Sequence, residues 1–134
     1  MAYEWTSDLE TGHALIDAQH KALFAAVNNF ADAFRNNKGN AEIEKTLHFL
    51  INYSERHFRD EEELHKRYNI PDLARHRQYH LDFKKDVRSL MDRFEKEGPT
   101  DALLNEIYLS IRDWLLHHIK SDDFVMAAAV RERM

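Results

Sequence analysis

The 134-residue chain contains no cysteine and only three glycines and two prolines. Without thiols it can form no disulfide, no iron–sulfur cluster and no thiolate zinc site, so any bound metal must be held by nitrogen and oxygen donors. The scarcity of glycine and proline disfavours a β-sandwich, because that fold needs many tight turns. The hydrophobic fraction of 43% is typical of a folded domain that can bury a core.

Long apolar runs and basic clusters are also absent from the sequence. No apolar run approaches the length of a membrane span, and the first residues, MAYEW, do not resemble a signal peptide. A net charge of −5, with no cluster of lysine and arginine, argues against nucleic acid as a partner. We therefore expect a cytoplasmic protein without a membrane or nucleic acid partner. Because no large apolar outer face stands out, we expect a monomer.

Apolar residues recur every three or four positions along four segments, which predicts four amphipathic helices. Gly39, Pro71 and Gly98-Pro99 interrupt this pattern, and each is a residue that ends helices or forms turns. Long helices with short connections imply an all-α, up-down-up-down four-helix bundle in a single domain, residues 1–134. The expected elements are an extended N-terminal arm anchored by Trp5 (1–16), four helices (about 17–37, 41–67, 72–96 and 100–120) and a C-terminal tail.

Nine histidines are a high count for a chain of this length. Their spacing indicates which of them lie at the surface and which face the interior. Every predicted helix places at least one polar residue on its apolar stripe: His20, His57, Glu61, His76, His80 and His118, followed by Asp122 or Asp123. Burying so many polar groups unpaired would cost about 2 kcal/mol or more each, against a total stability of about 5–15 kcal/mol. They must hydrogen-bond one another or bind metal, and metal binding accounts best for the whole set.

The number and type of these side chains limit the metal. Five imidazoles and two carboxylates are too many for one ion, since zinc takes four ligands and calcium and magnesium prefer oxygen. Two ions bridged by the carboxylates fit better, and the donor set suits iron, with manganese, cobalt and zinc as competitors. The ferritin-like di-iron pattern requires two Glu-x-x-His motifs. Within the predicted helices the motif occurs once, at Glu62-x-x-His65, so the site belongs to another class.

A series of motifs resembles the hemerythrin family, in its bacterial single-domain form, from about Trp5 to Phe124. The motifs follow the family's order and separations: Asp17-x-x-His20, His57-Phe58-x-x-Glu61-Glu62-x-Leu64, Tyr68-x-x-Pro71, His76-x-x-x-His80-x-x-Phe83 and Trp114-Leu115-x-x-His118-Ile119-x-x-x-Asp123. The match covers most of the chain, and the combination of motifs is specific.

The resemblance implies a centre of two iron ions (Fe²⁺/Fe³⁺) joined by an oxo or hydroxo bridge. The family's ligand positions correspond to His76, His80 and His118 on one iron, His20 and His57 on the other, and Glu61 and Asp123 between them. Dioxygen would bind reversibly at the open position of the second iron, in a pocket that excludes water. The residues at the family's pocket positions are Leu23, Phe58, Trp114 and Ile119, which are equally suited to an ordinary core.

Four residues, Asp122, Asp123, His65 and Glu62, need a separate interpretation. On an ideal α-helix, Asp122 shares the face of His118, whereas Asp123 lies about 140° away. The family pattern nevertheless favours Asp123 as the ligand and Asp122 as a solvated neighbour. His65 stands where relatives usually have methionine or another apolar residue. It is either a partly buried histidine at the end of the bundle or a residue that influences the site from beside a ligand. Glu62 belongs either to a solvated face or to the support of a ligand.

We favour a binding protein without enzymatic activity, which takes up dioxygen reversibly for storage, transport or sensing. One alternative is a di-iron redox enzyme acting on peroxide or nitric oxide, for which His65 is the only local support. The other is iron buffering, for which two ions per chain is a poor capacity. A reductase or an oxygen-consuming enzyme is a candidate partner. The remaining histidines, His13, His48 and His117, are predicted to lie at the surface.

Overall fold

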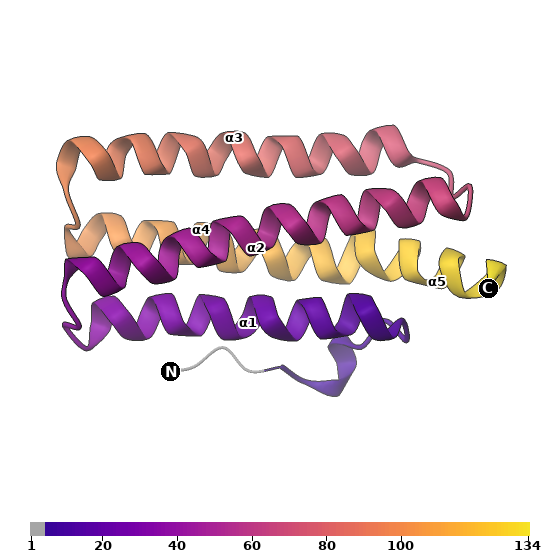
Figure 1. Ribbon diagram of the computed structural model, residues 1–134, viewed down its shortest axis with the longest axis horizontal. Coiled ribbons are helices and arrows are strands. Elements are labelled where there is room, and N and C mark those ends of the chain that lie inside the picture. The colour runs from indigo at the N-terminus through magenta and orange to yellow at the C-terminus, as the bar shows by residue number, and fades with distance from the viewer. Residues whose placement is uncertain (1–4) are drawn as a thin grey trace.

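The computed structural model describes residues 5–134 and shows an all-α fold without strands in that range (Figure 1). The prediction of an all-α four-helix bundle is confirmed. Its long helices are α1 (Ala14–Arg35), α2 (Asn40–Arg67), α3 (Leu73–Glu97) and α4 (Asp101–His118). A short 3-10 helix, η1 (Ser7–Leu9), precedes α1, and a π-helical turn, η2 (Ile119–Asp123), joins α4 to α5 (Phe124–Arg133).

The four long helices run side by side along the long axis of the molecule, and each packs on the next (Figure 1). Helix α1 contacts α2 and α4, and α3 contacts α2 and α4, so the bundle closes around one interior. The segment before α1 lies along that helix, where Trp5 packs edge-on against Phe24 with ring centroids 5.4 Å apart. This contact agrees with the expected role of Trp5 as an anchor.

Side-chain caps fix where two of the helices begin. The Thr100 hydroxyl accepts a hydrogen bond from the Leu103 amide at the start of α4, as its position before the helix leads one to expect. At the start of α1, His13 Nδ1 accepts from the Ile16 amide. Because His13 caps the helix, α1 begins at Ala14, three residues before the expected start. His13, which was predicted to lie at the surface, is therefore a partly exposed capping residue.

The turn between α2 and α3 holds the chain in an unusual conformation beside the bundle end. Asn69 (φ 53°) and Asp72 (φ 66°) both adopt the left-handed region, on either side of Ile70 and Pro71. Proline cannot continue a helix, and asparagine and aspartate tolerate this region better than most residues do. The turn directs the Ile70 side chain inward, where only 7% of it is exposed. Asp72 immediately precedes α3, but its side chain makes no capping hydrogen bond.

The chain after residue 120 is helical, which differs from the predicted C-terminal tail. Helix α4 passes through the π turn and continues as α5 to Arg133. Met126, Ala127 and Val130 are buried on one side of α5, where they pack with Ile16 and Ile70. This burial supplies the stabilisation that holds Phe124–Arg133 in a helix.

The apolar interior consists of two clusters with a polar layer between them. The larger cluster fills most of the bundle, and the smaller one lies beneath α5 and the turn between α2 and α3. Along α1, His20 stands between Ile16 of the small cluster and Leu23 of the large one. Along α2, Glu61 likewise stands between Phe58 of the large cluster and Leu64, which packs against the small cluster. The helices therefore bring the polar exceptions on their stripes to a common depth.

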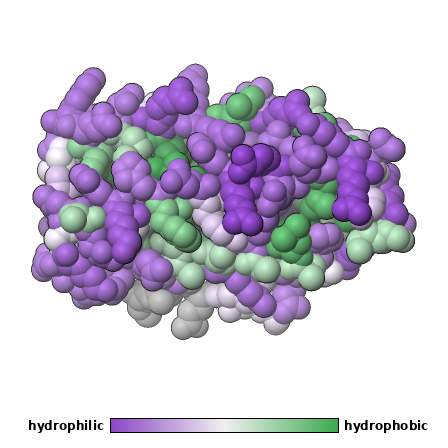
Figure 2. All heavy atoms as spheres, in the orientation of Figure 1, coloured by the Kyte–Doolittle hydropathy of each residue, from purple (hydrophilic) through white to green (hydrophobic). Residues whose placement is uncertain are grey.

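The outer surface in the view of Figure 2 is mostly hydrophilic, with apolar residues in separate patches. Within residues 5–134, no helix has the length and apolar character needed to cross a membrane.

Candidate metal centre

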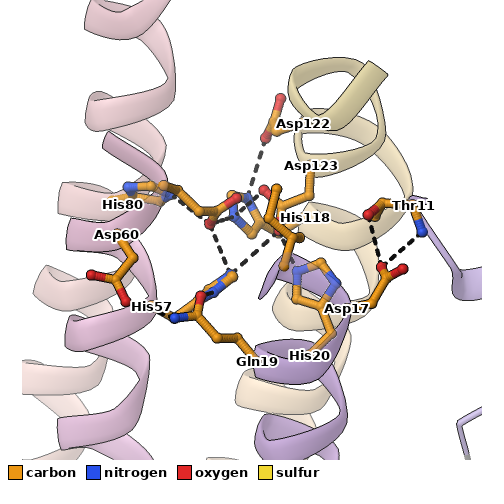
Figure 3. A network of polar contacts seen from close by, with 12 residues as sticks. Thr11, Asp17, Gln19, His20, His57, Asp60, His80, His118, Asp122 and Asp123 are labelled. Carbon is orange, nitrogen blue, oxygen red and sulfur yellow. Dashed lines mark hydrogen bonds and ion pairs between the residues drawn. The ribbon is translucent and has the colours of Figure 1, made fainter. Parts of the chain in front are cut away.

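The seven predicted ligand residues all lie in the polar layer, and none is more than 4% exposed. Figure 3 shows several of their side chains converging from different helices. Their origins are α1 for His20, α2 for His57 and Glu61, α3 for His76 and His80, α4 for His118, and the π turn for Asp123. Residues from 20 to 123 thus meet at one place only because the bundle is closed.

The π turn places Asp123, and not Asp122, inside the layer. A π turn closes between residues five apart, so Asp123 returns to the face of His118. Asp123 Oδ1 lies 2.9 Å from His118 Nε2, and Asp123 is fully buried. Asp122 remains outside, 3.5 Å from His118 Nδ1 and 3.4 Å from the exposed Arg75 guanidinium. The conflict between ideal helix geometry and the expected spacing is resolved by this local change of helix type.

The potential donor atoms form two overlapping groups, within each of which one atom per residue lies within 4.8 Å of the others. One group contains Glu61, His76, His80 and His118, and the other contains His57, Glu61, His118 and Asp123. His20 adjoins the second group, since its Nε2 lies 2.6 Å from Asp123 Oδ2. Glu61 Oε1 is 2.8 Å from His57 Nε2 and 3.1 Å from His118 Nε2, so this carboxylate stands between the two groups.

Buried polar atoms without hydrogen bonds are concentrated in this layer. In the described part of the chain they are His20 Nδ1, His57 Nε2, Glu61 Oε2, His76 Nε2, His80 Nε2, His118 Nδ1 and Asp123 Oδ1. The contact between His57 Nε2 and Glu61 Oε1 is short but lacks hydrogen-bond geometry. Leaving such atoms unpaired costs about 1–3 kcal/mol each. Apart from His20 Nδ1 and His118 Nδ1, each of these atoms lies within 3.8 Å of a nitrogen or oxygen atom of another of the seven residues without bonding it, as ligands of a shared cation would.

The electrostatics of the layer also favour positive charge. Burial alone would lower the pKa of His57, but Glu61 and Asp123 outweigh burial and raise it to about 9. The pKa of His118 is raised for the same reason, with burial opposing and the two carboxylates prevailing. Burial raises the pKa of Asp123, yet His118 and His20 hold it well below its ordinary value. The layer thus keeps its carboxylates ionised and attracts cations, whether protons or metal ions.

Residues 11–130 match the sequence model of a family described as "Hemerythrin HHE cation binding domain". The chain belongs to the hemerythrin family. A protein named Myohemerythrin from Theromyzon tessulatum is 29% identical over 122 residues, which cover 91% of this chain and 88% of the relative. Bacteriohemerythrin from Pseudomonas aeruginosa strain PAO1 is 31% identical over 130 residues, covering 97% and 82%. A Hemerythrin-like protein from Naegleria gruberi is 31% identical over 121 residues, covering 90% and 87%.

In this hemerythrin-family chain, side chains outside the seven support some of the histidines. His57 Nδ1 donates to Gln19 Oε1 at 2.7 Å, and Gln19 Nε2 donates to Asp60 at 2.6 Å (Figure 3). A carboxylate can only accept, so Asp60 fixes the orientation of the Gln19 amide, which in turn fixes the proton on His57. Neither Gln19 nor Asp60 was expected from the sequence. The one sequence signal that could have indicated these two residues is that Gln19 directly precedes His20 and Asp60 directly precedes Glu61.

Glu62 supports His80 in a similar way. Its Oε2 accepts from His80 Nδ1 at 3.1 Å, while its Oε1 accepts from Arg77 Nε at 2.8 Å. Its side chain is only 18% exposed. Burial raises the pKa of Glu62, but Arg77 and His80 outweigh burial and lower it. Of the two interpretations of Glu62, the structure therefore supports the one in which it orients a neighbouring histidine.

His65 contacts one of the seven residues directly. It is 3% exposed, and its Nε2 lies 2.6 Å from His76 Nδ1. Its Nδ1 lies 3.5 Å from the Ile70 carbonyl oxygen. Burial, reinforced by the nearby His76, lowers the pKa of His65. The remaining histidines, His48 and His117, are exposed, as predicted.

Apolar and aromatic side chains cover the large-cluster side of the layer. Leu23, Phe58 and Ile119 are at most 1% exposed, and Trp114 is half-buried. Phe58 stacks on His80 with centroids 4.2 Å apart, and Trp114 stacks on His118 at 4.6 Å. The same four residues contribute to the large core cluster. They therefore pack the bundle and, at the same time, form an apolar wall beside the candidate ligands.

Proposed function

We propose that this protein binds dioxygen reversibly at a non-heme di-iron centre. The predicted ligand set is retained: His76, His80 and His118 for one iron, His20 and His57 for the other, and Glu61 and Asp123 between them. The observation that supports it best is the pair of overlapping groups of buried donor atoms, within each of which the atoms lie within 4.8 Å of one another, together with the buried atoms of these residues that lack hydrogen bonds. The description of the family as cation binding and the names of the relatives point in the same direction.

The donor set fits two iron ions. Imidazole nitrogen combined with carboxylate oxygen suits iron, and two carboxylates between two groups of histidines suit a pair of ions. The buried carboxylates of Glu61 and Asp123 stay ionised, so they would offset part of the charge of the metals. Two ferrous ions would supply the two electrons and the open coordination position that reversible dioxygen uptake requires.

The protein's part in such chemistry is to orient ligands and exclude water. Gln19 and Glu62 hold His57 and His80 with Nδ1 protonated, which leaves Nε2 free to face the centre. Leu23, Phe58 and Ile119 present no polar side-chain atoms toward the layer, and they are almost wholly buried. A dry wall limits the entry of water and protons, which would otherwise promote irreversible oxidation of the irons.

A redox enzyme acting on peroxide or nitric oxide is the second candidate, and one observation favours it. The contact between His65 and His76 places an additional proton-carrying group beside a candidate ligand. Iron buffering is less well supported, because two overlapping groups of potential ligands, the ones found within residues 5–134, would give a small capacity for storage.

The three functions differ in a spectroscopic experiment on the iron-loaded protein. The protein is reduced without oxygen, exposed to air and then stripped of oxygen, while its visible absorption is recorded through several cycles. Charge-transfer bands that appear and vanish with the gas support reversible binding. Bands that persist, together with multiple-turnover peroxide consumption, would instead establish the enzyme. Rapid loss of iron to a weak chelator would establish buffering.

A matched pair of variants tests the role of the wall. Leu23→Asn adds a polar amide beside the layer, and in a folded, iron-loaded sample it should speed irreversible oxidation. Leu15→Asn makes the same change on the same helix at a position that is 47% exposed, and should behave like the parent. Equal oxidation rates in both variants would refute the assignment of Leu23 to the wall of the oxygen site.

A further inference from the structure

We propose that His65 is a positioning residue that fixes the tautomer and ring orientation of His76, and that the turn after α2 in turn fixes His65. This inference rests on the proposed metal centre, although not on dioxygen binding. It assigns a function to a buried histidine that belongs to neither group of potential donors.

The positions of the protons follow from the Ile70 carbonyl, which can only accept a hydrogen bond. His65 Nδ1 faces that oxygen at 3.5 Å, so Nδ1 carries the proton of a neutral His65 ring. Its Nε2 is then an acceptor, and it lies 2.6 Å from His76 Nδ1. His76 must therefore be protonated on Nδ1, which leaves its Nε2 as the atom with a free lone pair.

The free nitrogen of His76 faces the candidate metal centre. His76 Nε2 has no hydrogen bond, and it lies 3.3 Å from Asp123 Oδ1 and 3.8 Å from Glu61 Oε2. A histidine that binds a metal through one nitrogen usually donates its other N–H to a partner, which sets the ring orientation. For His76 the partner is another imidazole, whereas His57 has an amide and His80 a carboxylate.

The backbone of Ile70 contacts both the main chain and the side chain of His65. The Ile70 amide donates to the His65 carbonyl at 3.0 Å, while the Ile70 carbonyl faces the His65 ring. Asn69 in the left-handed region and Pro71 set the direction of the Ile70 peptide groups. The buried Ile70 side chain anchors the turn in the small apolar cluster. The turn and the ligand are therefore connected through one chain of contacts, from Ile70 through His65 to His76.

The tautomers can be measured directly with zinc as a diamagnetic probe. In ¹⁵N-labelled protein loaded with Zn²⁺, long-range ¹H–¹⁵N spectra should show protons on Nδ1 of both His65 and His76, with His76 Nε2 bound to metal. A proton on Nε2 of either ring would overturn the proposal. This measurement uses the parent protein and needs no substitution.

Two substitutions at position 65 separate the hydrogen bond from simple packing. His65→Leu removes the acceptor, and it should weaken one of the zinc equivalents about 10- to 100-fold in a competition titration with a fluorescent chelator. His65→Gln keeps an acceptor oxygen and should restore most of the affinity. His48→Leu, the same change at an exposed position of α2, is the control and should match the parent.

Two titration results would refute the proposal: parental affinity in His65→Leu, or a loss in His65→Gln equal to that in His65→Leu. If His65→Leu fails to fold, the proposal is tested by the tautomers measured in the parent protein and by the zinc affinity of His65→Gln compared with that of the parent. A protein that loads zinc as expected but fails to bind dioxygen reversibly would refute the proposed function alone. A reversible carrier whose zinc affinity is indifferent to position 65 would refute this inference alone.

Discussion

Deleting Ser121 should turn the π turn into regular α-helix without moving Asp123 out of the metal centre. In a regular helix, residues four apart differ by about 40° around the axis, and residues five apart by about 140°. Asp123 is five residues after His118, and the π turn compensates for the extra residue. After the deletion, the same aspartate becomes the fourth residue and lies on the face of His118 in an ordinary helix. Residues of α5 keep their register relative to the bundle for the same reason.

Inserting one alanine after Ser121 should have the opposite effect. Asp123 would become the sixth residue after His118, and a regular helix would turn it about 120° away from that face. In the parent protein, the Asp123 carboxylate lies 2.6 Å from His20 and 2.9 Å from His118, and all three side chains are buried. Removing one partner from such a buried group costs about 3–5 kcal/mol of folding stability.

Metal titration of both variants, followed by thermal unfolding, measures the difference. The deletion variant should take up two metal equivalents and unfold like the parent, whereas the insertion variant should bind metal more weakly and, without metal, lose the folding stability given above. If the deletion weakens binding as severely as the insertion, the site requires the π geometry itself. The reasoning that the turn serves only to bring Asp123 onto the correct face would then be refuted.

Three further outcomes are expected. His118→Ala should prevent full iron loading, measured by iron analysis, whereas His117→Ala should load normally because that side chain is exposed; the reverse result would contradict the orientation of α4. Iron removal should lower the melting temperature by about 10 °C, which corresponds to roughly 3 kcal/mol for a ligand present at 100 times its Kd; an unchanged melting temperature would argue against a buried site. In the metal-free protein, the pKa of His57 is about 9 against an ordinary 6.5. Protonation of His57 therefore stabilises the folded state fully below about pH 6.5, and this contribution, on the order of 3 kcal/mol, is lost as the pH rises through about 9; a flat denaturation profile over that interval would contradict it.

The helical period in the sequence predicted the bundle because long stripes of apolar residues leave few alternatives. The same period placed His20, His57 and His118 on the inward faces, and the structure buries all three. The last helix was missed because Ala127-Ala128-Ala129 adds little to an apolar stripe. Its burial depends on Ile16 and Ile70, which are distant in sequence. The π turn was also missed, since the five residues of that turn have no local pattern that distinguishes them from an α-helix.

The supporting residues are harder to predict than the seven candidate ligands. Gln19 reaches His57 across the interface of α1 and α2, and Glu62 reaches His80 from α2 to α3. Such contacts depend on helix packing and on rotamers, which periodicity does not specify. His65 could be singled out as a polar residue on an apolar stripe, but its contact with His76 required the turn between α2 and α3. Sequence spacing predicts which face a side chain occupies, and tertiary packing decides which atom it meets.

The polar layer makes folding and cation binding interdependent. The two apolar clusters stabilise the bundle on either side of the layer, while the layer itself leaves buried donor atoms without hydrogen bonds. In the metal-free state protons supply part of the missing positive charge, as the raised pKa values of His57 and His118 show. A metal ion must displace those protons, so metal and protons compete for the same nitrogen atoms. The carboxylates that raise the pKa of these histidines therefore also attract the metal, and the cost of burying the layer without a cation becomes part of the driving force for metal uptake.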